Sequence, residues 1–129
     1  MADEKKVLVI DDNPEILEMI RLVLKNEGLK VIDSENGVLG LELARKEKPD
    51  LIILDIMLPE MSGFKLCRIL KGEGETKHIP IVVLTALNDQ ETKQESLASY
   101  ADDYLPKPVD RKTIVSKVRK FLNPMEEKA

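Results

Sequence analysis

The 129-residue sequence holds a single cysteine and a single histidine, and it lacks any long apolar run. Cys67 has no second cysteine with which to form an internal disulfide, which is compatible with a reducing compartment. His78 has no histidine or cysteine partner, so we do not expect a zinc-type site there. No stretch approaches the roughly 20 apolar residues of a membrane span, and the N-terminus "MADEKK" lacks the apolar core of a signal peptide. We therefore expect a cytoplasmic protein without a membrane partner.

An excess of positive charge is also missing. With a net charge of -4, the chain has no general attraction to nucleic acid or to anionic membranes. We therefore expect no direct nucleic acid binding by this domain. The length fits one domain whose core needs no disulfide or metal. We expect that domain over residues 1–124 and a frayed polar tail over residues 125–129.

Short apolar runs alternate with helix-like segments along the chain. The runs predict five strands, at Lys5–Ile10, Lys30–Asp33, within Leu51–Pro59, at Ile79–Leu84 and at Ala101–Leu105. Between and after them we expect five helices: from Pro14 to a stop at Gly28, over Gly37–Lys48, Phe64–Lys71 and Asn88–Ser99, and around Ile114 to Leu122.

Two of these helices have weak apolar faces. On the second, Val38, Leu41 and Leu43 form the expected buried face, which is looser than that of the first helix. The segment Asn88–Ser99 has only Leu97 and Ala98 as apolar anchors, so we expect a weakly held helix there.

The strand runs "LIIL" and "IVVL" are apolar at every position instead of at alternate ones. This pattern is typical of strands that are covered on both faces, as in a parallel sheet between two layers of helices. The sequence therefore predicts an α/β fold with a five-stranded parallel sheet flanked by five helices. In such sheets the carboxyl ends of the strands share one edge, where binding sites form.

Asp55 is a lone acid inside the apolar stretch "LIILDIMLP". Burial penalises its charged form, so something must compensate for it. Two interpretations are open for Asp55 taken by itself: a carboxylate that reaches solvent at a strand end, or a functional acid.

Four other polar residues fall at the same edge of the predicted sheet, and they favour the functional interpretation: Asp11, Asp12, Thr85 and Lys107. Three gathered carboxylates repel one another unless a cation is present, and an all-oxygen site with room for water suits Mg²⁺. Lys107 would add a second positive charge beside Asp55. A carboxylate held between a metal and an ammonium group can act as a nucleophile toward phosphorus.

These segments, from "VLVIDDN" through "LIILDIMLPEMSG" and "IPIVVLTA" to "ADDYLPKP", resemble the receiver domain of two-component response regulators, including the single-domain chemotaxis regulator. The resemblance covers nearly the whole chain and implies a flavodoxin-like sheet of strand order 2-1-3-4-5. It implies that Asp55 is the phosphoacceptor. It also implies that the Asp12 and Asp55 side chains and the Met57 carbonyl bind Mg²⁺, with Mn²⁺ as a substitute, while Asp11 acts through water.

The resemblance further implies that Thr85, Ala86 and Lys107 surround the phosphoryl group, that the Lys107–Pro108 peptide is cis and that Tyr104 is a switch residue. A sensor histidine kinase or phosphotransfer protein would donate the phosphoryl group. The face of the fourth helix, fifth strand and fifth helix would then change to control an output protein or domain, or to form a phosphorylation-dependent dimer. No separate substrate would be turned over.

The chain departs from the family pattern at two places. Tyr100 stands where a glycine is usual, so the preceding helix must end without an easy left-handed residue or accept strain. Met57 and Leu87 are apolar at positions that govern water access to the phosphoryl group, which predicts slow autodephosphorylation. We also expect the Met57 side chain to pack against its neighbours.

Three alternatives remain at the level of sequence. An aspartate phosphatase normally carries its nucleophile in a "DxD" pattern on the first strand, whereas this chain has Asp11-Asp12-Asn13. A nucleotide- or flavin-binding module requires a glycine-rich phosphate loop, which is absent there. An inert receiver-like interaction domain is the third alternative. It is disfavoured because the three acids, the Thr85 hydroxyl and the Lys107 amine of the site are all present.

Overall fold

Five parallel strands form one sheet in the order β2-β1-β3-β4-β5. The computed structural model describes residues 4–86 and 100–122. The strands are β1 (Lys6–Ile10), β2 (Lys30–Ser34), β3 (Leu51–Asp55), β4 (Ile81–Thr85) and β5 (Asp103–Pro106). The predicted parallel sheet and its strand order are confirmed, with β1 and β3 side by side in the middle.

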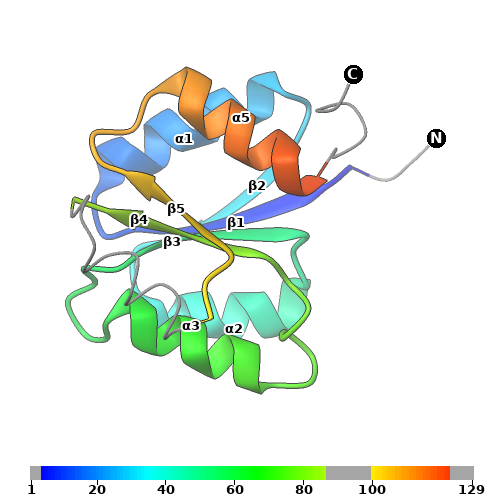
Figure 1. Ribbon diagram of the computed structural model, residues 1–129, viewed down its shortest axis with the longest axis vertical. Coiled ribbons are helices and arrows are strands. Elements are labelled where there is room, and N and C mark those ends of the chain that lie inside the picture. The colour runs from blue at the N-terminus through cyan, green and yellow to red at the C-terminus, as the bar shows by residue number, and fades with distance from the viewer. Residues whose placement is uncertain (1–3, 87–99, 123–129) are drawn as a thin grey trace.

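Helices cover both faces of this sheet (Figure 1). The helices α1 (Pro14–Asn26) and α5 (Arg111–Leu122) lie on one face, and α2 (Gly37–Glu47) and α3 (Gly63–Gly72) lie on the other. The remaining predicted helix, Asn88–Ser99, falls outside the described residues, as does the predicted tail. No helix in the described part of the chain is both long enough and apolar enough to cross a membrane.

The two layers explain why the strand runs are apolar at every position. In β1, Leu8 and Ile10 pack into the cluster under α2 and α3, whereas Val7 and Val9 pack into the cluster under α1 and α5. All five residues of β3 are buried. Because each fully buried Val, Leu or Ile side chain contributes about 1.5–3 kcal/mol, these clusters fix the strands in place.

The first helix begins and ends as its sequence predicts. Asn13 caps α1, because its side-chain oxygen accepts hydrogen bonds from the backbone N–H groups of Glu15 (2.8 Å) and Ile16 (3.4 Å). Pro14 occupies the first turn, where no backbone donor is needed. Gly28 follows the helix with a φ of 81°, the left-handed conformation that glycine adopts easily.

The buried face predicted for α2 is partly wrong. Val38 is 52% exposed, and the helix instead turns Gly37, Gly40 and Ala44 toward the sheet. A Cβ atom on Gly40 would lie 2.5 Å from Cδ1 of Ile10, so any larger residue would force the Ile10 side chain to move. Small residues therefore bring α2 close to the sheet, and its larger apolar side chains lie at the margins.

Two strands, β4 and β5, begin two residues later than predicted. Ile79 is buried, but its N–H bonds to the Thr76 carbonyl in a turn, and Pro80 has no donor for the ladder, so β4 begins at Ile81. Before β5, the Asp102 carboxylate accepts the Ile81 N–H at 2.8 Å in place of a backbone carbonyl. These local hydrogen bonds replace regular pairing at the amino ends of β4 and β5.

Candidate functional site

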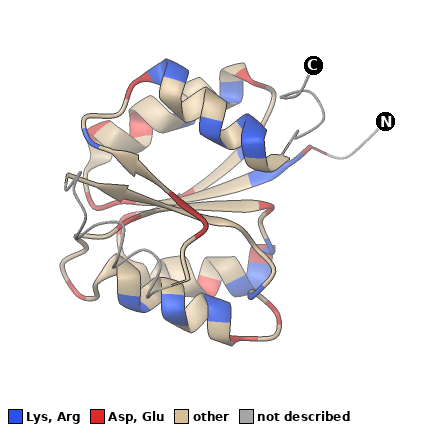
Figure 2. Cartoon of the chain, viewed as in Figure 1, with Lys and Arg blue, Asp and Glu red and all other residues tan. Residues whose placement is uncertain are grey.

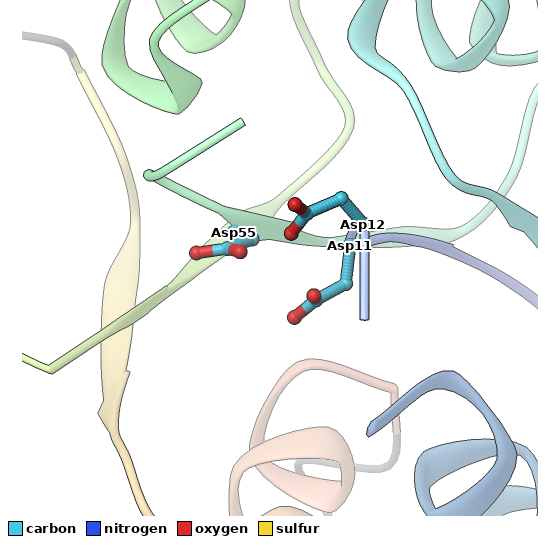
Figure 3. A group of neighbouring side chains, drawn as sticks. All are labelled: Asp11, Asp12 and Asp55. Atoms are coloured by element: carbon cyan, nitrogen blue, oxygen red, sulfur yellow. The ribbon is translucent and has the colours of Figure 1, made fainter. Parts of the chain in front are cut away.

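Three carboxylates meet at the carboxyl edge of the two central strands. Asp11 and Asp12 directly follow β1, and Asp55 is the last residue of β3, which pairs with β1. One carboxylate oxygen from each of the three lies within 4.8 Å of the others, and the three side chains are neighbours at the ends of the two strands (Figure 3). Asp11 and Asp55 are buried, whereas Asp12 is exposed. We call this group the acidic cluster.

Lys107 brings a positive charge into the acidic cluster from the far side of β4. It follows β5, and its backbone N–H donates to the Thr85 carbonyl at 2.7 Å. Its Nζ lies 3.3 Å from Oδ2 of Asp55 and 3.5 Å from Oδ2 of Asp11. The Lys107–Pro108 peptide bond is cis, the conformation that the receiver resemblance implies. One ammonium group thus serves two buried carboxylates.

The carboxylate of Asp55 is oriented by the turn that follows it. Its Oδ1 accepts the Met57 N–H at 3.0 Å, and its Oδ2 lies toward Lys107. The turn closes where Met57 bridges to Ser62 and where the Gly63 N–H donates to the Ile56 carbonyl at 2.9 Å. These contacts hold the nucleophile candidate at a defined position.

Gly63 is a site residue that the sequence prediction missed. A Cβ atom there would lie 2.2 Å from the carbonyl oxygen of Asp55 and 2.5 Å from Cα of Ile56. Glycine is therefore needed for the turn to fold back onto the end of β3. The available signal was a glycine directly after a helix-capping serine, Ser62, but close backbone packing is not visible in a sequence.

Asp11 is the least satisfied acid of the cluster. Its Oδ1 accepts the Asn13 N–H at 2.9 Å, but its buried Oδ2 accepts no hydrogen bond from the described residues. Burial raises the pKa of the Asp11 carboxyl, and the charge of Asp55 adds to this, while the Asn13 N–H and Lys107 act in the opposite direction and do not overcome it. The cluster thus holds more negative charge than Lys107 alone neutralises.

This donor set fits a hard divalent cation. Carboxylate oxygens, one exposed acid and an unbonded buried oxygen match the all-oxygen coordination of Mg²⁺, which keeps several waters. The described residues offer no sulfur or imidazole ligand to this group. Of the acidic groups that the sequence singled out, all three lie together here.

The remaining predicted site residues differ in their burial and in their distance along the chain from the strand ends. Thr85 ends β4 and is fully buried, and Ala86 follows it on the surface. Tyr104 is half-buried on β5 and pairs with Val83. Because Val83 is two residues before Thr85, Tyr104 lies two residues back from the sheet edge that carries the acidic cluster. The predicted packing of Met57 is wrong, because its side chain is 69% exposed. The turn fixes the backbone of Met57 and leaves its side chain in solvent.

The comparisons with known proteins agree on one family. The family model described as response regulator receiver domain matches residues 7–119. Protein PilH of Pseudomonas aeruginosa is 35% identical over 117 residues, which are 91% of this chain and 97% of PilH. The DNA-binding response regulator MtrA of Mycolicibacterium smegmatis is 39% identical over 123 residues, which are 95% of this chain and 53% of MtrA. The chain therefore spans about half of MtrA but nearly all of PilH.

Solved structures give the same result. The chemotaxis protein CheY4 of Vibrio cholerae superposes with a TM-score of 0.88 at 32% identity, covering 93% of this chain and all of CheY4. The receiver domain of the sensor histidine kinase PA1611 of Pseudomonas aeruginosa has a TM-score of 0.84 at 25% identity and covers 92% of this chain and 98% of that one. That structure is described with a magnesium ion coordinated in its active site cleft.

Proposed function

Because the chain belongs to the response regulator receiver domain family, we propose that Asp55 is the phosphoacceptor of a two-component switch. The observation that carries this proposal is the setting of the Asp55 carboxylate. It is buried, fixed by the Met57 N–H, and 3.3 Å from the Lys107 ammonium group in a cluster of three acids. The family match also favours a receiver over the phosphatase and nucleotide-module alternatives.

Mg²⁺ is the metal that we propose for the acidic cluster, with Mn²⁺ as a substitute. The Asp12 and Asp55 carboxylates and the Met57 carbonyl would bind it, and Asp11 would act through water. Two findings support this assignment: the buried Oδ2 of Asp11 accepts no hydrogen bond from the described residues and has only the Lys107 ammonium group, 3.5 Å away, beside it, and the cluster has an excess of negative charge. When bound, the metal neutralises charge on the oxygens of the transferring phosphoryl group.

The residues of this chain would do the rest of the chemistry by position and charge. An Asp55 carboxylate oxygen bonds to phosphorus while the P–N bond of a donor phosphohistidine breaks, and the electron pair of that bond stays on the imidazole. Lys107 offsets the charge on the phosphoryl oxygens, and the Thr85 hydroxyl donates to one of them. The small Ala86 side chain leaves room beside the phosphoryl group. The donor would be a sensor histidine kinase or a phosphotransfer protein.

In the proposed switch, Tyr104 couples phosphorylation of Asp55 to a change at the protein surface. Movement of Thr85 toward the phosphoryl group would let Tyr104 turn inward and change the surface around β5 and α5. Thr85 and Tyr104 lie on adjacent strands that are joined by regular pairing, which supports such coupling. An output domain, a separate output protein or a second copy of the chain would read the change.

A small phosphodonor tests the phosphoacceptor directly. Incubation with acetyl phosphate and Mg²⁺ should add about 80 Da of labile mass, and Asp55→Asn should abolish it. Asp50→Asn is the matched control, because Asp50 precedes β3 at its opposite end and binds the Lys6 N–H at 2.8 Å. Phosphate recovered on any residue other than Asp55 would contradict the assignment.

The exposed Met57 side chain bears on the lifetime of the phosphoryl group. An apolar group at this position orders no attacking water, so we propose slow autodephosphorylation. Met57→Asn should leave the rate of phosphoryl loss unchanged or increase it. A slower loss of the added mass in this variant would show that Met57 does not limit water access.

A further inference from the structure

A groove of about 380 Å³ lies near the amino ends of β4 and β5, at the opposite edge of the sheet from the acidic cluster. It is lined by the C-terminal turn of α3, the loop before β4 and Tyr100: Arg68, Lys71, Gly72, Lys77 and Tyr100. Nothing in the proposed phosphoryl chemistry uses these residues. The groove therefore requires its own explanation.

Tyr100 is strained and exposed at once. Its φ is 67°, a conformation that glycine adopts freely but that is an outlier for a bulky side chain. Its side chain is 68% exposed, so little burial offsets the strain. Residues held in such sparsely populated conformations cluster at functional positions. The tyrosine ring is thus held in the solvent at a position where glycine would fit better.

The groove also carries positive charge that the described residues do not neutralise. Lys71 is engaged: its Nζ lies 2.8 Å from the Asp102 carboxylate and donates to the carbonyls of Ile79 at 2.8 Å and Lys77 at 3.4 Å. Arg68 and Lys77 are exposed, and neither side chain forms an ion pair within residues 4–86 and 100–122. Within the described part of the chain, two cations are therefore without an acidic partner.

The chemistry of the groove matches a ligand with a flat ring and an anionic group. Aromatic side chains stack on nucleobases, and Arg and Lys bind phosphates. The volume lies within the range of small-molecule sites, about 300–1,000 Å³. A stable protein interface would need roughly 800 Å² per partner with an apolar centre. The other exposed large apolar side chains of the described chain do not line this groove: Leu22, Val38, Leu39 and Met57.

We propose that this groove binds a nucleotide, with the base stacked on Tyr100 and the phosphates held between Arg68 and Lys77. The groove shares no residue with the acidic cluster, so the proposal is tested on the unphosphorylated chain. The proposal therefore stands or falls independently of the proposed function.

Titration of the full chain with ATP in Mg²⁺-free buffer tests the proposal by calorimetry and by amide chemical shifts. ATP should shift the signals of Arg68, Lys77 and Tyr100, and adenosine and tripolyphosphate should each bind about tenfold more weakly, because each offers only half of the contacts. Shifts confined to the acidic cluster would overturn the proposal. Binding of hexaglutamate to the groove without binding of ATP would also overturn it, in favour of an acidic protein partner.

Substitutions separate a ligand-binding role of Tyr100 from a structural one. Tyr100→Gly should weaken ATP binding about tenfold without lowering the Tm, since glycine relieves the strain. A Tm that falls would show that the ring is retained for packing, and unchanged binding would show that it is not a contact; either result overturns the proposal. Arg68→Glu should also weaken binding about tenfold or more, whereas Lys65→Glu, on the same helix but outside the groove, should not.

Discussion

Two ion-pair clusters near opposite ends of β5 have opposite charge balances. Asp103, the first residue of β5, lies 2.8 Å from Nζ of Lys117 and 2.9 Å from Nζ of Lys120, both on the basic helix α5 (Figure 2). Lys107, just after β5, is shared by the carboxylates of Asp11 and Asp55. One acid has two cations in the first cluster, and one cation serves an excess of acids in the second.

The pKa directions follow this balance. Burial would raise the pKa of Asp103, but hydrogen bonds from Lys117, Lys120 and the Tyr104 N–H bring it below its ordinary value. Burial raises the pKa of Asp11, and its partners do not reverse this. The Asp103 cluster, in which the acid is fully paired, stabilises the packing of α5 against β5. The Lys107 cluster has unpaired negative charge and can bind a cation that the chain does not supply.

The largest expected difference between the clusters is chemical. Lys107→Ala should reduce the rate of phosphorylation by acetyl phosphate about 10²–10³-fold, because it removes a fixed donor to the developing charge. Lys117→Ala removes a lysine of similar burial from the other cluster and should leave the rate within about twofold of the original. Mass spectrometry of timed samples measures both. Equal rates in the two variants would show that the clusters do not differ in function.

The backbone beneath Asp55 gives the next largest effect. Gly63→Ala should destabilise the protein by about 2–3 kcal/mol, because the new methyl group collides with the Asp55 carbonyl and the turn must shift. Gly72→Ala is the control, since it lies in α3 with no atom within 4 Å of a new Cβ and should be neutral or stabilising by up to about 1 kcal/mol. Urea denaturation compares them, and a stable Gly63→Ala variant would show that the turn relaxes without strain.

The sequence was sufficient to predict the sheet and the grouping of the three acids. Runs of apolar residues identify strands covered on both faces, and parallel strands carry the residues that follow them to one edge. Asp11, Asp12 and Asp55 could therefore be placed at that edge from the pattern alone, whereas the side-by-side order of their two strands was implied by the resemblance to receiver domains. The helix start at Pro14 and the stop at Gly28 were predictable because each depends on local backbone chemistry alone.

Other features depend on packing between distant segments, which no local pattern contains. The close approach of Gly40 to Ile10 turns Val38 outward, and the collision that requires Gly63 involves a backbone carbonyl eight residues earlier. The pairing of Asp103 with Lys117 depends on how α5 lies against β5. Each needs the relative placement of two elements to within about an ångström.

The stabilising cluster provides a smaller and purely structural test. Asp103→Asn should lower stability by about 1–2 kcal/mol at pH 7, because it leaves two lysines without their acid. Since the folded pKa is below the ordinary value of 3.8, the contribution of Asp103 is present above that value and is lost as the pH falls through the folded pKa. Denaturation at pH 7 and pH 3 should show a shrinking difference from the original protein. Glu60→Gln, at an exposed loop position, should show no such difference.

The smallest expected effect is an increase in stability, and it tests the charge balance of the acidic cluster directly. Asp11→Asn should raise the stability of the metal-free protein by about 1 kcal/mol at pH 7, since it removes one of three mutually repelling charges while an amide oxygen can still accept the Asn13 N–H. With a folded pKa above 3.8, Asp11 retains a proton that the unfolded chain has lost, so stability falls as the pH rises through that window. The variant should lack this fall.

Added Mg²⁺ should make the original protein more stable than the variant, because an ion that binds only the folded state stabilises it according to its affinity, and that affinity needs the carboxylates. Thermal denaturation with and without Mg²⁺ measures both effects. A metal-free variant less stable than the original protein would mean that Lys107 alone compensates the buried acids and that the contrast between the two clusters is false.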